Sequence, residues 1–165
     1  MCAWARNGTP DTLTSASTTL AITDLTAYKF NVFIMHCFPN GSEAIEPRFS
    51  LTNYSGTGHA NRGSKNGAAD TTVTSNNNWV TNVTDAADDN FNISYFSNID
   101  AEEKLAIIFS VVNNGSGAGN APQRREVVGK YNDGSSNSQV TVIYNIDTAT
   151  DKKAIDSNLS ALGTD

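Results

Sequence analysis

Residues 28–38 read Tyr28-Lys29-Phe30-Asn31-Val32-Phe33-Ile34-Met35-His36-Cys37-Phe38, and their apolar side chains alternate along the chain. The even positions are apolar or aromatic throughout, whereas the odd positions begin polar and become apolar from Phe33 onward. Alternation with a period of two places successive side chains on opposite faces of a β-strand. The stretch therefore predicts a long central strand that starts with one polar face and becomes buried on both.

A second strand of this kind is predicted over residues 104–112, where both faces again carry apolar side chains. Shorter alternating segments, separated by turns rich in Gly, Asn and Asp, predict further strands. These segments are residues 48–54, 60–65, 71–75, 79–83, 91–96, 124–131, 138–146 and, as a last edge strand, 158–162. Residues 99–103 can form one helical turn, and helix is expected to stay under ~15%, against ~30–35% in an average globular protein.

About eight to ten strands with frequent turns and almost no helix are typical of an antiparallel β-sandwich. Two strands that are apolar on both faces fit the middle of two packed sheets better than a single open sheet. The predicted fold class is all-β, an antiparallel sandwich of jelly-roll type, with an immunoglobulin-like Greek key as the alternative. A length of 165 residues indicates one domain, with extended segments at about residues 1–13 and 148–165. The strand order stays open.

The alternation also assigns side chains to the core. The predicted core residues are Phe30, Val32, Ile34, Phe49, Leu105, Ile107, Phe109, Val140, Val142 and Tyr144. On this assignment, Phe109→Ala would cost about 3–5 kcal/mol of stability. His36 falls on the apolar face of the first strand and is expected to be a hydrogen-bonded core residue. His59 falls in a glycine-rich segment and is expected at the surface.

The composition limits the partners of the protein. Only 17% of the residues are charged, and Asn, Thr, Ser and Gly together account for 66 of 165 residues. The scarcity of Lys and Glu excludes a helix bundle or coiled coil, and the 38% hydrophobic content, gathered in runs, excludes wholesale disorder. The net charge of −6 argues against binding to nucleic acid or to an anionic membrane, because both need an excess of Lys and Arg.

Residues 1–10 lack the apolar run that a signal peptide needs, and no apolar run in the sequence reaches the ~18 residues of a transmembrane helix. We therefore expect synthesis in a cytoplasm and no membrane partner. Cys2, in a terminal tail, and Cys37, in an apolar run, are expected to be reduced thiols rather than a disulfide. Lys152 and Lys153 are expected to be solvated.

The sequence predicts no catalytic residue and no cofactor. Asp85, Asp88 and Asp89 offer several loop oxygens for Ca²⁺, but they lack the regular spacing of an EF-hand, and a solvated loop is the alternative. The glycine-rich residues 115–119 are expected to form a loop between strands rather than a phosphate cradle, because no Lys-Ser or Lys-Thr pair and no helix follow them.

Two pairs of residues suggest binding or assembly. Trp79 and Tyr54 offer aromatic platforms for a sugar ligand, although aromatic residues of a sandwich are more often core or interface. Arg124 and Arg125 are adjacent on a predicted strand, so their side chains point to opposite faces. One of them can then reach a neighbour in an inter-subunit salt bridge, with ordinary surface as the alternative.

Two blocks of the sequence resemble β-sandwich virion proteins of tailed phages. The first spans residues 53–72 and includes His59-Ala60-Asn61-Arg62-Gly63-Ser64-Lys65-Asn66-Gly67; the second reads Gly117-Ala118-Gly119-Asn120-Ala121-Pro122-Gln123-Arg124-Arg125-Glu126-Val127-Val128-Gly129-Lys130-Tyr131. The similar stretches extend over roughly residues 28–165. The resemblance implies a capsid decoration (cement) protein or a subunit of a fibre or spike, without catalytic residues and often trimeric. Head and tail locations both stay open.

The expected function is that of a non-enzymatic structural protein on the outer surface of a phage particle, acting through protein–protein assembly. Its expected partners are itself, as a homotrimer, and other virion proteins such as the major capsid protein. Neutral faces rich in Thr, Asn and Ser suit such interfaces, and residues 1–13 and 148–165 are expected to clasp a neighbour. The expected location is the virion. The alternative is a carbohydrate- or receptor-binding module of a tail fibre or spike, with its site around Trp79 or Tyr54.

Overall fold

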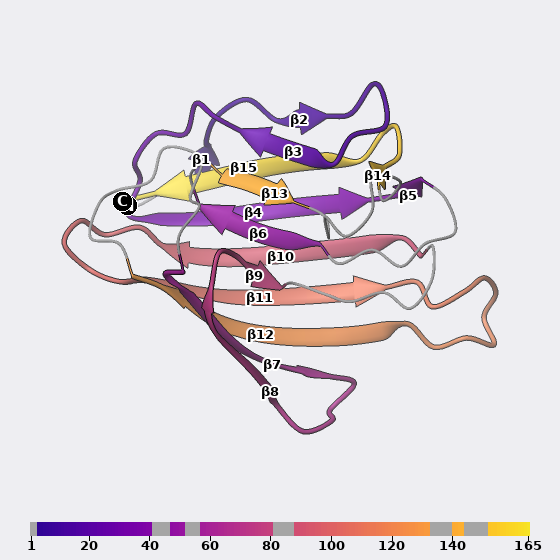
Figure 1. Ribbon diagram of the computed structural model, residues 1–165. Coiled ribbons are helices and arrows are strands. Elements are labelled where there is room, and N and C mark those ends of the chain that lie inside the picture. The colour runs from indigo at the N-terminus through magenta and orange to yellow at the C-terminus, as the bar shows by residue number, and fades with distance from the viewer. Residues whose placement is uncertain (1–2, 41–46, 52–56, 81–87, 133–139, 144–151) are drawn as a thin grey trace.

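The computed structural model describes residues 3–40, 47–51, 57–80, 88–132, 140–143 and 152–165 (Figure 1). This part of the chain forms fifteen β-strands and no helix, and every strand pairing in it is antiparallel. The strands are β1 (Ala5–Arg6), β2 (Asp11–Thr12), β3 (Thr19–Ile22), β4 (Phe30–Cys37), β5 (Pro39–Asn40), β6 (Arg48–Leu51), β7 (His59–Lys65), β8 (Thr71–Asn76), β9 (Trp79–Val80), β10 (Asn90–Ser97), β11 (Lys104–Val112), β12 (Gln123–Tyr131), β13 (Val140–Ile143), β14 (Lys152–Lys153) and β15 (Asn158–Thr164). Ten of them are four residues or longer, in agreement with the predicted number.

The strands form one large sheet, one small sheet and a two-stranded ribbon. The large sheet has the order β1-β15-β4-β10-β11-β12-β7-β8, with β2 also paired to β15. The small sheet has the order β3-β13-β6-β9, and β14 pairs with β5. In Figure 1 the small sheet lies in front of the middle of the large sheet. The small sheet therefore covers one face of the large sheet.

Aromatic side chains join the two sheets. Phe49 of β6 stacks on Phe96 of β10, with ring centroids 4.9 Å apart, and lies 5.2 Å from the ring of Phe33 on β4. Trp79 of β9 contacts Phe96 with ring centroids 5.0 Å apart. All four side chains are buried, and each stabilises the fold by ~1.5–3 kcal/mol or more. The antiparallel sandwich predicted from the sequence is confirmed.

The main chain of the large sheet positions Trp79. Its Nε1 donates hydrogen bonds to the carbonyl oxygens of Ala60 on β7, at 3.1 Å, and Lys130 on β12, at 3.0 Å. The indole ring lies against Gly129 of β12, where a Cβ atom would be 2.7 Å from Nε1. Glycine at position 129 therefore leaves the space that the ring occupies.

Gly129→Ala is expected to destabilise the protein by roughly 1–3 kcal/mol, because the added methyl group overpacks the contact with Trp79. Urea denaturation measures the loss. Gly119→Ala is the matched control, since no atom lies within 4 Å of the position that its Cβ would take. Equal stability of the two variants would contradict the tight contact between Gly129 and the indole.

The two central strands form as predicted, but the core lies on the other face of each. The side chains that face the core include Phe33, Met35 and Cys37 on β4 and Ala106 and Ile108 on β11. Both faces of these strands are apolar, so alternation alone does not choose between them. Bulky rings need small groups opposite them. The aromatic cluster between the sheets therefore favours, as the core face of β11, the face with the smaller side chains.

The core assignment from the sequence is therefore partly wrong. Phe30, Leu105, Ile107 and Phe109 are 43%, 57%, 49% and 46% exposed. Phe49 and Val32 are buried as predicted, and Ile34 is half-buried. The side chains of Val140, Val142 and Tyr144 lie outside the described part of the structure.

Two further segments differ from the sequence-based expectation. The predicted edge strand, β15, lies inside the large sheet, where it pairs with β4 on one side and with β1 and β2 on the other. Its Leu159 and Ala161 are buried, so this part of the C-terminal segment belongs to the core and is not a loose clasp. Residues 99–103 form a non-helical turn instead of the predicted helical turn. The side chain of Lys104 is buried, and its Nζ donates hydrogen bonds to the carbonyl oxygens of Ile99 and Glu102.

The face assignment predicts different costs for two phenylalanines. Phe96→Ala is expected to cost about 3–5 kcal/mol, because the ring is 4% exposed and contacts three aromatic rings. Phe109→Ala is expected to cost less than about 1.5 kcal/mol in the isolated chain, because the ring is 46% exposed. Urea denaturation at submicromolar protein measures both, and a larger loss for Phe109→Ala would contradict the assignment.

Candidate interaction surface

The face of the large sheet that the small sheet does not cover is apolar. We call it the open face and define it by the outward side chains of β4, β10 and β11. The apolar ones are Phe30, Val32, Ile34, Phe91, Ile93, Tyr95, Leu105, Ile107, Phe109 and Val111. The register places them in rows across the strands: Tyr95 lies opposite Val32 and Ile107, and Ile93 lies opposite Ile34 and Phe109. The result is a continuous apolar stripe three strands wide.

The open face is large for a surface exposed to water. Seven of its side chains, together with Val128 on the bordering β12, are 41–57% exposed. At ~150–200 Å² for each large side chain, the exposed apolar area is roughly 600 Å², at the top of the ~300–600 Å² range for the largest patch of a typical monomer. Patches of this size mark surfaces that bind another protein or a membrane.

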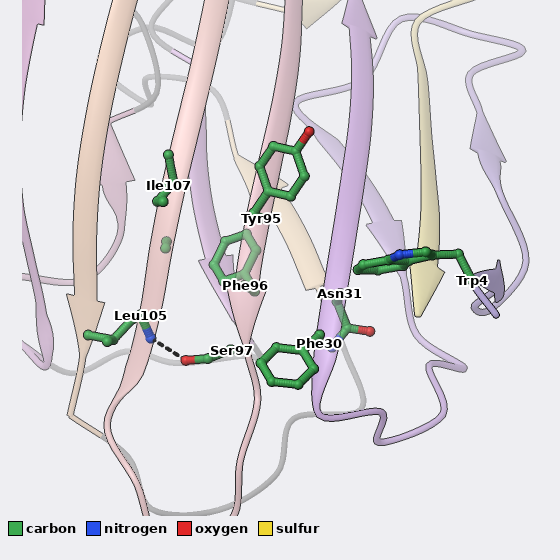
Figure 2. Close-up of a pocket in the computed structure, with 9 residues that line it drawn as sticks. Trp4, Phe30, Asn31, Tyr95, Phe96, Ser97, Leu105 and Ile107 are labelled. Atoms are coloured by element: carbon green, nitrogen blue, oxygen red, sulfur yellow. Dashed lines mark hydrogen bonds between the residues drawn. The ribbon is translucent and has the colours of Figure 1, made fainter. Parts of the chain in front are cut away.

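One end of the open face is hollowed (Figure 2). The hollow has a volume of about 300 Å³, and its apolar walls come from Trp4, Phe30, Tyr95, Leu105 and Ile107. Trp4 is 49% exposed and precedes β1, and its ring extends over the sheet toward β4 (Figure 2). Exposed aromatic side chains of this kind are enriched among the residues that dominate protein–protein binding energies.

The amide of Asn31 and the hydroxyl of Ser97, which line the hollow, already have partners. Asn31 Oδ1 accepts a hydrogen bond from Asn7 Nδ2 at 2.7 Å, and Asn31 Nδ2 donates to the Tyr28 carbonyl at 3.1 Å. Ser97 Oγ accepts from the Leu105 main-chain nitrogen at 2.9 Å (Figure 2). A sugar needs polar groups that are available for its hydroxyls, so the hollow suits an aliphatic or aromatic group instead.

The two borders of the open face differ in charge. On β12 the outward residues include Arg124, whose Nε lies 3.6 Å from Glu126 Oε1, and Lys130, whose Nζ lies 3.2 Å from Glu103 Oε2. On β15 the corresponding positions near the stripe carry neutral residues such as Ser160. The apolar stripe thus has a charged border on one side and a neutral polar border on the other, as protein interfaces have a polar rim.

The two predicted arginines lie on opposite faces of β12, as their adjacency requires. Arg124 is exposed beside the open face. Arg125 is 8% exposed and lies on the inner face, opposite Ser110 of β11. Arg124 is therefore the one of the pair that a neighbouring molecule can reach.

The predicted sugar platform is not formed by Trp79. This side chain is fully buried in the aromatic cluster between the sheets, so its ring is closed to a ligand. Tyr54 lies outside the described residues. Trp79 is a core residue because Gly129, on β12 of the facing sheet, leaves room for the ring.

The acidic loop before β10 is tied to the glycine-rich loop. Asp88 Oδ1 accepts a hydrogen bond from the Gly115 main-chain nitrogen at 3.0 Å, and the Asp89 carbonyl accepts from the Asn113 nitrogen at 3.0 Å. Asp85 lies outside the described residues. Within the described residues, no group of three or more His, Cys, Asp or Glu side chains is placed to hold a metal ion.

Both histidines differ from the sequence-based expectation. His36 is half-buried on the open-face side of β4, where its ring contacts Phe38 with centroids 4.4 Å apart. His59 is fully buried on β7, stacked on Tyr131 at 4.4 Å and edge-on to Trp79 at 4.9 Å. Burial lowers the pKa of His59 to about 4, opposed by the main chain of Asn76. His59 is thus a neutral core residue rather than a surface residue.

Lys153 was also expected at the surface and is fully buried on β14. Its Nζ donates to the Thr18 carbonyl at 2.7 Å. Burial lowers the pKa of Lys153 to about 7, and Cys37 and Asp11 oppose this shift. Cys37 is a fully buried thiol, whereas Cys2 and the side chain of Lys152 lie outside the described part of the chain.

Comparison with protein-family models and with curated proteins finds no match to this chain. In the described part of the structure, no helix is long and apolar enough to cross a membrane. The open face is therefore interpreted from its own residues. The sequence does contain a pattern that marks the open face, because residues 104–112 are apolar on both faces. That pattern does not distinguish a second core from an exposed surface.

Stability is expected to fall as the pH falls from about 6.5 to about 4, because the unfolded chain binds a proton on His59 that the folded chain does not. The slope from this one group is at most ~1.4 kcal/mol per pH unit. Melting temperatures across this range test the effect. His59→Phe is expected to flatten the profile, whereas the control His36→Phe is expected to retain it. An unchanged profile in His59→Phe would assign the acid sensitivity to other groups.

Proposed function

We propose that this protein is a non-enzymatic structural subunit on the outer surface of a virus particle, and that it acts by protein–protein assembly. One observation carries the proposal: the open face, an apolar stripe across the middle of the large sheet. Its exposed members include Leu105, Ile107 and Phe109. Binding of another protein over such a face is favourable, because it removes the apolar surface from water.

Three features support a protein partner over other partners. The hollow at the end of the face is lined by apolar groups, and its polar groups Asn31 and Ser97 are already hydrogen-bonded. The net charge of −6 disfavours nucleic acid and anionic membranes. The border on β12 carries Arg124, Glu126 and Lys130, which suits the polar rim of a protein interface.

The placement in a particle rests on the resemblance of the blocks around residues 53–72 and 117–131 to virion proteins of tailed phages. The partners that follow are other copies of this chain and virion proteins such as the major capsid protein. A decoration protein of the capsid and a subunit of a tail fibre or spike both fit this description. The two differ in copy number, because a capsid exposes hundreds of equivalent sites and a tail only a few.

Quantitative mass spectrometry of purified virus particles from the source of the sequence tests the proposal. Peptides of this chain are expected at the stoichiometry of a structural protein, and their copy number separates the capsid role from the tail role. Mild detergent and salt washes are the control for adventitious attachment, because a structural subunit stays with the particles. Absence of the chain from washed particles would overturn the proposed function.

A further inference from the structure

β10 is the middle strand of the apolar stripe. β4, β15 and β1 follow it on one side, and β11, β12, β7 and β8 follow it on the other. We propose that a second copy of this chain covers the open face, packed face to face about a two-fold axis that runs along β10. The proposal rests on the assembly role proposed above and names the partner of the open face.

The size of the face fits a second copy. A stable protein–protein interface buries ~800 Å² on each partner, of which more than half is apolar. The open face supplies roughly 600 Å² of exposed apolar area, and the outward residues of β12 and β15 supply a polar remainder. Across a two-fold axis each chain presents the same surface to the other. The interface is therefore complete with two chains, and no further chain can add to it.

The width of the large sheet favours two copies over the three expected from the sequence. Strands are spaced ~4.8 Å apart and packed sheets ~10 Å, so three sheets around a three-fold axis can each present only about three to four strands. The large sheet continues on both sides of the stripe, through β15 on one side and through β12, β7 and β8 on the other. These flanks would collide in a trimer, whereas two sheets stack flat.

Two directions of the two-fold axis bring different charged side chains together. With an axis across the strands, β12 would lie over β12 of the second copy in reversed direction and bring Arg124 toward Lys130. With an axis along β10, β12 lies over β15, whose outward residues near the stripe, such as Ser160, are neutral. The second arrangement keeps Arg124 and Lys130 apart, but it lays β7 over β1 and brings the exposed Arg62 near the exposed Arg6, which lies in the same row of the sheet. The charges therefore do not select the axis by themselves, because like charges in contact cost binding free energy in either arrangement.

The arrangement with the axis along β10 fills the hollow. Phe30 and Leu105 lie at the same end of the face, joined through Ser97: Phe30 pairs with Ser97, and the Leu105 nitrogen donates to its hydroxyl at 2.9 Å. An axis along β10 keeps this end in place and lays β11 of one copy over β4 of the other. Leu105, which is 57% exposed, then enters the hollow between Trp4 and Phe30 of the second copy. The contact occurs twice in each pair.

Native mass spectrometry and analytical ultracentrifugation at about 20 μM test the pairing. A dimer is expected for the wild type, and Ile107→Asp at the centre of the stripe is expected to weaken dimerisation at least 100-fold. Ile107 is 49% exposed, so the isolated variant is expected to stay folded; if it does not, Ile107→Thr keeps a β-branched residue and is expected to weaken dimerisation at least 10-fold. Thr72→Asp is the matched control, because Thr72 lies in the same row of the sheet, on the distant β8.

Cross-linking tests the axis. In a Cys2→Ser background, Phe91→Cys at the end of β10 is expected to join two chains through a short bismaleimide. The reason is that an axis along β10 places each residue of this strand next to the same residue of the second chain. Thr72→Cys is expected to remain uncross-linked. With an axis across the strands, Phe91 would face the other end of β10, so failure of Phe91→Cys to cross-link in a dimer overturns the proposed orientation.

A monomer, a trimer, or a dimer that tolerates Ile107→Asp overturns the proposed pairing. These results separate it from the proposed function. A chain that is present in washed particles but monomeric in solution contradicts the pairing and leaves the structural role standing. A dimer that is absent from the particles contradicts the structural role and leaves the pairing standing.

Discussion

The packing of four aromatic rings between the two sheets determines which face of the large sheet becomes the core. The rings belong to Phe33, Phe49, Phe96 and Trp79, with centroid distances of 4.9–5.2 Å. Rings this close need small groups or none on the strands that face them, which Gly129 and Ala106 provide. Leu105, Ile107 and Phe109 of β11 point to the opposite face, which the small sheet does not cover.

The polarity of β10 is unusual for a strand inside a sandwich. Its inward side chains before Phe96 are Asn90, Asn92 and Ser94, all buried, whereas Phe91 and Tyr95 point outward and are 41% and 46% exposed. Asn92 accepts a hydrogen bond from Ser110 and donates one to Asn90. Hydrogen bonds within this buried group offset the cost of removing the amides from water, although they contribute less hydrophobic stabilisation than apolar residues would.

The sequence predicts the strands well because their period is local. The positions of β4, β11 and β12 are found within two residues of the predicted limits, since alternation and turn residues are properties of neighbouring positions. The inward face is a property of contacts that are distant in sequence, such as Phe33 with Phe49, and local alternation does not contain it. For this reason Phe109 was assigned to the core, and the buried Lys153, whose partner Thr18 is 135 residues away, was assigned to the surface.

The apolar alternation that predicts the strands does not reveal the candidate surface. A strand that is apolar on both faces predicts burial on both, and the small sheet covers only one of them. Covering the open face would place β4 and β11 between two layers, as the sequence pattern indicates. Stability and assembly are then linked by mass action, because association buries Ile107 and Phe109 on the strand next to the one that carries Phe96. The apolar alternation on which the fold prediction relies would thus be fully satisfied only in the proposed pair of chains.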